Sequence, residues 1–240
     1  MGTFRRLVDG LAVNVKTIRL GHGAHDPHDG EGCVMEIVSQ LYGEPWSDTP
    51  KCADPVVANL AIAINDHCSD EQRQRLWPFT LRIGMTNQGK RESRRRKYIL
   101  ADHAVRKLAP LLYEDDLSVE DTEWLRSLPA IRDKRSYDKV VRLLTQREHS
   151  DPDGYWDEIN NCIDNITSRR EVGSEIVEYA LSFTAFTSAV LDVLLDALDA
   201  VCPPAPSVRD AELLNWLGLE PLAGDQEMWD PALVETPRKR

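Results

Sequence analysis

Several signatures of common enzyme classes are absent from this sequence of 240 residues. There is no G-x-x-x-x-G-K-S/T or G-x-G-x-x-G phosphate-binding loop, no G-x-S-x-G nucleophile elbow and no H-E-x-x-H metal motif. The common nucleotide-dependent enzymes and serine hydrolases therefore lose weight as interpretations. No cofactor is predicted.

Signals for export or lipid attachment are also missing. The first residues, MGTFRRLVDGLAVNV, lack the continuous apolar core of a secretory signal, and Arg6 stands where the myristoylation pattern needs Ser or Thr. The five cysteines are odd in number and include no Cys-x-x-Cys pair, which favours reduced thiols over a disulfide framework. We therefore expect a cytoplasmic protein.

Positive charge is in deficit, because the formal net charge is -11 at pH 7. Such a field repels phosphate, so nucleic acid and anionic membrane are not expected partners. The one strongly apolar stretch, Tyr179 to Cys202, contains Asp192, Asp196 and Asp199 at helical spacing. Carboxylates are costly in lipid, so we expect no membrane span and interpret these aspartates as the solvated face of a core helix.

Helical periodicity dominates the chain. Hydrophobic residues make up 42% of the sequence, which is enough for a core, and strand signals are nearly absent after residue 20. We predict a mainly α fold, an irregular multi-helix bundle. Asp9-Gly10, between apolar-rich flanks, is compatible with a short N-terminal β-hairpin.

Capping residues indicate where individual helices begin. Asp54-Pro55 predicts a helix that runs to about His67, and Ser69 with Gln72 forms a capping-box pattern before a helix that bends at Pro78. Ser118 predicts another helix start. Longer helices are expected over residues 91–113 with a kink at Pro110, and over residues 136–147, 155–166 and 172–201.

The clearest linker is a cluster of turn residues at Asp151-Pro152-Asp153-Gly154. It divides the chain into an N-terminal helical region, residues 1–150, and C-terminal helices, residues 151–220, that pack on it. Residues 221–240 have weak periodicity and are predicted to form a mobile tail. The pattern leaves open whether the two helical regions are one domain.

Nearly all of the unusual chemistry lies between Gly21 and Asp66, with three histidines and two cysteines. Cys33 stands at the expected start of a helix, whose dipole would lower the pKa of its thiol. With Cys33 as nucleophile, His25 as base and Glu36 as the orienting carboxylate, the segment would suit a thiol-dependent enzyme. The alternative, which we favour, is a buried cysteine with Glu36 as an ordinary capping residue.

The same segment offers metal ligands. His25, Asp26 and Cys33 supply imidazole, carboxylate and thiolate, which are ligand types for zinc and other transition metals. Their spacing matches no established ligand pattern, and a polar, solvated loop is the simpler interpretation.

The run GEPWSD is a candidate interaction loop. Glu44 and Asp48 would either share a pocket with His25 or belong to a loop that docks Trp46 into the core. The structural interpretation is favoured, because a loop tryptophan and local side-chain-to-backbone bonds are ordinary devices.

A basic run begins at Lys90 and contains the candidate interaction residues Arg94, Arg95 and Arg96. It lies near a helix N-terminus, where positive charge is least favourable. Contact with phosphate or with an acidic protein is one explanation, and a solvated charged face is the other. Tyr98 is the one aromatic residue nearby, so single-stranded nucleic acid has little support.

Short motifs in the first third of the chain resemble a family of uncharacterised helical proteins from actinobacteria and their phages. They are Gly23-Ala24-His25, the CVME run after Gly32, the GEPWSD run, and the later Pro50, Cys52, Pro55 and Val56. The resemblance implies a helical fold and no particular activity. Family members often carry Asp-His-Pro where this chain has Asp48-Thr49-Pro50.

Taken together, these features predict a soluble, non-enzymatic helical protein that acts as a protein–protein interaction or scaffold module. Self-association through the helix at residues 172–201 is one version. A thiol-dependent enzyme built on Cys33 and His25 is the first alternative, and a metal-binding or nucleic-acid-associated protein is the second.

Overall fold

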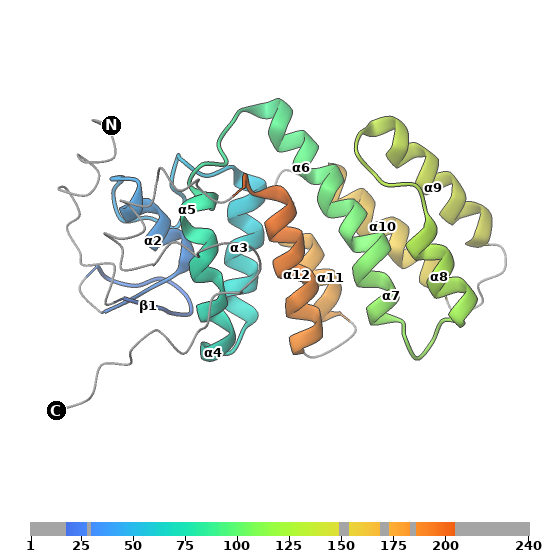
Figure 1. The fold of residues 1–240 in the computed structure, drawn as a ribbon, viewed down its shortest axis with the longest axis horizontal. Helices are drawn as coiled ribbons and strands as arrows, with labels where there is room; N and C mark the ends of the chain where they lie inside the picture. The colour runs from blue at the N-terminus through green and yellow to red at the C-terminus, as the bar shows by residue number, and fades with distance from the viewer. Residues whose placement is uncertain (1–17, 28–29, 149–153, 169–172, 183–185, 205–240) are drawn as a thin grey trace, which may run out of the picture.

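Helices make up most of the regular structure in residues 18–27, 30–148, 154–168, 173–182 and 186–204, which are the residues that the computed structural model describes (Figure 1). They confirm the mainly α, multi-helix fold that the periodicity predicts. The β-hairpin expected at Asp9-Gly10 and the tail at 221–240 lie outside the described residues.

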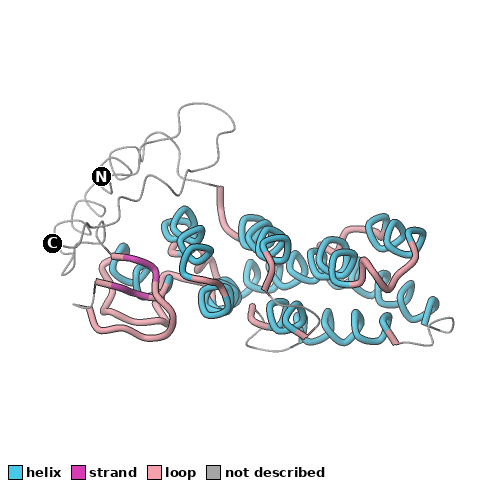
Figure 2. The backbone as a smooth tube through the Cα atoms, turned by 90° about the horizontal axis from the view of Figure 1, so that it is seen from below, coloured by secondary structure: helices cyan, strands magenta, loops and turns pink. Residues whose placement is uncertain are grey.

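A short pair of strands precedes the first described helix. Strand β1 (Arg19–Leu20) pairs in parallel with β2 (Glu31–Gly32), with Arg19 opposite Glu31 and Leu20 opposite Gly32. Figure 2 shows the two strands side by side at one end of the molecule. Helix α2 (Val34–Leu41) follows, and every one of its residues is buried.

The predicted caps start the next helices. Asp54 accepts a hydrogen bond from the Val56 backbone N–H, and α3 runs over Pro55–His67. The capping box of Ser69 and Gln72 is present and opens α4 (Asp70–Arg73). Beyond it the chain tightens into the 3₁₀ segment η2 (Gln74–Phe79), which contains Pro78, and ends in α5 (Thr80–Ile83).

The long helix predicted for residues 91–113 is interrupted in the middle. Helix α6 (Lys90–His103) widens into the π-helical segment η3 (Ala104–Leu108) and continues as α7 (Ala109–Leu112). Pro110 explains the interruption, because it has no N–H to donate to the carbonyl of Arg106 and its ring would collide with that carbonyl. The wider turn lets the Ala109 N–H bond the Ala104 oxygen instead.

The remaining described helices are α8 (Val119–Ser127), α9 (Lys134–Glu148), α10 (Tyr155–Ser168), α11 (Glu175–Leu181) and α12 (Ser188–Val201). The prediction of one helix over residues 172–201 is wrong. Thr187 has an extended backbone and accepts a hydrogen bond from the Val190 N–H, so it caps a new helix. The apolar periodicity of the two helices is similar, which concealed the break.

The helices form an elongated arrangement with α2 at one end and α8 and α9 at the other (Figure 1). After α10 packs on α9 and α6, the chain returns to the middle, where α12 packs on α3 and α6. Buried apolar side chains from Ile18 to Val201 belong to one cluster. The described residues before 149 and those after 153 therefore contribute to the same core.

The aspartates of α12 are exposed, as expected for a solvated face, and they also join α12 to its neighbours. Asp192 pairs with Arg75 at 2.6 Å, Asp199 pairs with Arg82 at 2.5 Å, and Asp196 pairs with Lys107. The apolar face of α12 is buried in the core. No helix in the described part of the chain is long and apolar enough to cross a membrane.

Gly173, in the turn before α11, lies directly against the backbone of α3. A Cβ atom at this position would collide with the backbone oxygen of Val56 and the backbone nitrogen of Leu60, neither of which can rotate away. We predict that Gly173→Ala lowers the free energy of unfolding by about 3 kcal/mol, because overpacking here must displace a helix backbone. Urea denaturation followed by circular dichroism measures the change.

The neighbouring substitution Ser174→Ala is the matched control, because the Ser174 side chain forms no capping hydrogen bond. It should change the free energy of unfolding by less than about 0.5 kcal/mol. Equal stability of the Gly173→Ala variant and the wild type would show that position 173 does not pack this closely against the backbone of α3.

Candidate functional site

The start of α2 is built from a reciprocal pair of side chains. Cys33 Sγ accepts a hydrogen bond from the Glu36 backbone N–H at 3.4 Å, and Glu36 Oε2 accepts one from the Cys33 backbone N–H at 2.7 Å. This is a capping box in which a thiol replaces the usual hydroxyl. Both residues thereby supply partners that the open end of a helix needs.

His25 is held against the same carboxylate. Its backbone N–H donates to Glu36 Oε1 at 3.1 Å, and its ring Nδ1 lies 3.3 Å from Glu36 Oε2. On the other side, the Trp46 indole donates to the His25 backbone oxygen at 2.8 Å. The His25 loop and the start of α2 thus meet at one buried carboxylate, and Trp46 is joined to them through the His25 backbone. We call Cys33, His25 and Glu36 the Glu36 cluster.

The expectation of a lowered thiol pKa at Cys33 is wrong. Burial raises the pKa of Cys33 to about 12, and the charge of Glu36 also raises it. The helix N-terminus acts in the expected direction, because the backbone N–H groups of Glu36 and Met35 lower the pKa, but desolvation is the larger effect. Cys33 is 5% exposed. A role as nucleophile with His25 as base therefore gains no support from the geometry.

A metal site at His25, Asp26 and Cys33 gains no support either. Within the described ranges, no group of three or more His, Cys, Asp or Glu side chains is arranged to hold a metal ion. Asp26 is exposed, whereas Cys33 is buried in the capping box, so the two side chains lie in different environments. His28 and Asp29, which the sequence places in the same loop, lie outside the described residues.

The GEPWSD loop is closed by Glu44. Its carboxylate accepts hydrogen bonds from the backbone N–H groups of Lys51 at 2.6 Å and Cys52 at 2.8 Å. Trp46 packs on Gly32, where a Cβ atom would lie 2.9 Å from the indole ring. Asp48 is exposed and stays outside these contacts. Glu44 and Trp46 therefore shape the loop, and the structure does not bring Glu44, Asp48 and His25 into one pocket.

The three candidate arginines of α6 lie in different environments. Arg94 and Arg95 are exposed, and Arg95 pairs with Glu92 at 3.4 Å. Arg96 is 5% exposed, and its guanidinium donates to the Val201 backbone oxygen at 2.9 Å and to Gln88 at 3.1 Å, and lies 3.3 Å from Asp54. The assignment of Arg96 as an interaction residue is corrected accordingly, because its charge is used inside the fold.

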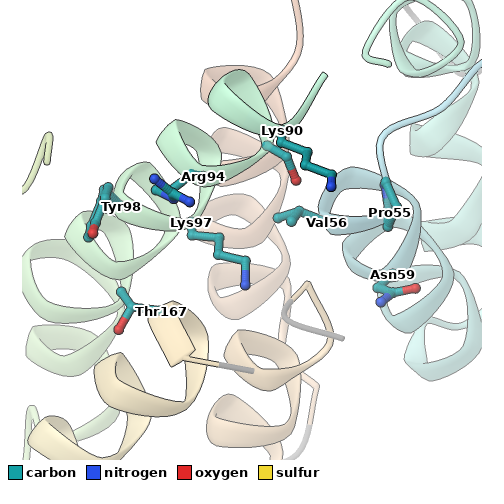
Figure 3. A pocket seen from close by; sticks show the side chains of 9 residues that line it. Pro55, Val56, Asn59, Lys90, Arg94, Lys97, Tyr98 and Thr167 are labelled. Atoms are coloured by element: carbon teal, nitrogen blue, oxygen red, sulfur yellow. The ribbon is translucent and has the colours of Figure 1, made fainter. Parts of the chain in front are cut away.

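Sequence reasoning missed an open cleft between α3, α6 and the end of α10 (Figure 3). Its volume is about 790 Å³, and Lys90, Arg94 and Lys97 line one side of it. These residues recur at i, i+4 and i+7, which places them on one helical face. That spacing was the available signal, but the sequence alone does not show which neighbour the face meets.

A second polar group that the sequence did not single out lies beside the π-helical segment. His103 Nε2 is 3.3 Å from Asp196 Oδ2 and 3.2 Å from Lys107 Nζ, while His103 Nδ1 lies 3.0 Å from the Ile99 oxygen. Desolvation is the largest single effect on Asp196 and raises its pKa, but hydrogen bonding and charge from Lys107 and His103 together lower the pKa by more. The group joins α12 to α6 and η3.

No family model, no curated protein and no solved structure matches this chain. The resemblance to helical proteins of actinobacteria and their phages therefore stays a prediction, and the function has to be inferred from the geometry.

The Glu36 cluster gives a prediction about thiol reactivity. Because burial raises the pKa of Cys33 to about 12, its thiolate is scarce at neutral pH, and we expect iodoacetamide to label it at least about a hundredfold more slowly than a free thiol at pH 8. Peptide mass spectrometry after timed labelling measures the rate, with urea-unfolded protein as the control. Rapid labelling of Cys33 in the folded protein would contradict the structural role.

The carboxylate itself gives a second prediction. Glu36→Ala leaves the buried N–H of Cys33 and the N–H of His25 without their acceptor, so we expect the free energy of unfolding to fall by about 3 kcal/mol. Glu36→Gln keeps an acceptor oxygen and should lose less. Asp48→Ala removes an exposed carboxylate from the nearby loop and should stay within about 0.5 kcal/mol of wild type. Chemical denaturation of the three variants measures these changes in the free energy of unfolding.

Proposed function

We propose that this protein is a non-enzymatic helical scaffold that acts through contact with a protein partner. One observation supports this most: the side chains that are richest in chemistry, those of the Glu36 cluster, are bonded to one another and to nearby backbone. A catalytic thiol needs access and a low pKa, and Cys33 has neither. A reducing compartment such as the cytoplasm is part of the proposal, since all five cysteines are free.

The contact surface that we propose is the solvent face of α6. Arg91 and Arg95 lie one turn apart, and both are exposed. They occupy a different face from Lys90, Arg94 and Lys97, which border the cleft. In a chain of net charge -11, this local positive surface favours an acidic partner.

Self-association through α12 is not part of the proposal. Most apolar residues of this helix are buried within the monomer, and Asp192, Asp196 and Asp199 are paired with neighbouring basic residues. No apolar stripe of α12 is left to bind a second copy.

Affinity capture from a native lysate of the source cells tests the proposal. The wild type should recover one protein in stoichiometric amount at low salt. The double variant Arg91→Glu/Arg95→Glu should recover at least about tenfold less, because a charge reversal at an interface both removes attraction and adds repulsion. Acidic residues near a helix N-terminus do not oppose the dipole, so the variant should remain folded.

The matched control is Arg126→Glu/Lys139→Glu, which makes the same charge change at exposed positions on α8 and α9. It should recover as much partner as the wild type. Recovery of no stoichiometric protein, or equal loss in both double variants, would contradict the proposal.

A further inference from the structure

The cleft beside α6 is lined from three directions. Pro55, Val56 and Asn59 come from the first turns of α3, Thr167 comes from the last turn of α10, and the rest of the lining comes from α6: Lys90, Ser93, Arg94, Lys97 and Tyr98. Figure 3 shows Lys90 extending toward the first turn of α3 and Lys97 extending toward the end of α10. Two amines from one helix thus reach toward opposite walls of the same space.

The described lining of this cleft supplies positive charge and no negative charge. Of the described residues that line it, three are cations and none carries a carboxylate. Neither Lys90 nor Arg94 forms an ion pair with a described residue. Asp54, which caps α3 and faces Arg96, also acts on Lys97, so among the described residues the unpaired charge at the cleft is that of Lys90 and Arg94.

Lys90 lies in the first turn of α6, where the helix dipole makes positive charge unfavourable. Burial lowers the pKa of Lys97, and the neighbouring positive charge of Arg94 lowers it further, because the two cations repel each other. An anion bound between Lys97 and Arg94 would attract both side chains and offset this repulsion.

We propose that the cleft binds a small phosphorylated molecule, with its phosphate between Lys90, Arg94 and Lys97 and its organic part against Tyr98 and Val56. Lysine and arginine together provide both point charge and forked hydrogen bonding for phosphate oxygens. Asn59, Ser93 and Thr167 add side chains that can bond hydroxyl groups of the ligand.

The size and composition of the cleft favour a small ligand over a polymer. A volume of about 790 Å³ lies within the usual range of small-molecule sites. Among the described lining residues Tyr98 is the one aromatic side chain, so they offer successive bases of a nucleic acid no stacking platform. The net charge of -11 also opposes the approach of a long polyanion.

Calorimetric titration of the full chain in phosphate-free, low-salt buffer tests the proposal, with phenyl phosphate, inorganic phosphate and benzyl alcohol as probes. Phenyl phosphate should bind at least about fivefold more tightly than inorganic phosphate, because its ring reaches the apolar wall, and benzyl alcohol should not bind measurably. The double variant Lys90→Gln/Lys97→Gln should weaken phenyl phosphate at least about tenfold, since it removes two charge-assisted contacts.

The matched control is Arg91→Gln/Arg95→Gln, which removes two charges from the solvent face of the same helix. It should leave phenyl phosphate binding unchanged, so the outcome is independent of whether a protein partner binds that face. Thermal denaturation without ligand establishes that both double variants are folded.

Three results would overturn the proposal. They are the absence of phenyl phosphate binding to the wild type, equal weakening by the two double variants, and tighter binding of a glutamate-rich peptide or of single-stranded DNA that is lost in Lys90→Gln/Lys97→Gln.

Discussion

The relative placement of α3, α6 and α12 depends on the buried guanidinium of Arg96. It faces the Asp54 carboxylate that caps α3, it donates to the last residue of α12, and it bonds Gln88 ahead of α6. A buried ion pair contributes less to stability than its Coulomb energy suggests, because both charges are desolvated. The ion pair instead fixes the rotation of α6 about its own axis. As a result Lys90, Arg94 and Lys97 border the cleft beside α3, and Arg91 and Arg95 face solvent.

The Glu36 carboxylate plays a comparable role at the end of the molecule where α2 lies (Figure 1). One side chain accepts hydrogen bonds from two backbone N–H groups and faces an imidazole, so the loop between β1 and β2 and the start of α2 share one acceptor. A buried carboxylate is tolerated when several donors surround it. The residues that suggest catalysis in the sequence therefore have a sufficient structural explanation, which shifts attention to side chains at the edge of the core.

Local signals in the sequence predicted much of the fold. Asp54, Ser69 and Ser118 cap helices where expected, since a cap depends on residues within one turn. The break before Thr187 was missed because the apolar pattern on both sides of it is similar. The cleft and the different environments of Arg94, Arg95 and Arg96 could not be predicted, because helical spacing assigns residues to faces but not faces to neighbours. The pKa of Cys33 was mispredicted for the same reason, since burial is a tertiary property.

The π-helical turn at η3 changes the direction in which the side chains of α7 point relative to those of α6. An extra residue in a turn advances the phase of every later side chain by about a quarter of a rotation relative to an unbroken helix. Before the turn, α6 meets α3, α10 and α12. After it, α7 meets α8, and the Tyr113 hydroxyl at the end of the helix reaches Glu158 of α10 and Tyr179 of α11. Pro110 would ordinarily break a helix, but the π-helical turn accommodates it. The rotated end of the helix can then contact α8 and α11 as well as the neighbours of α6.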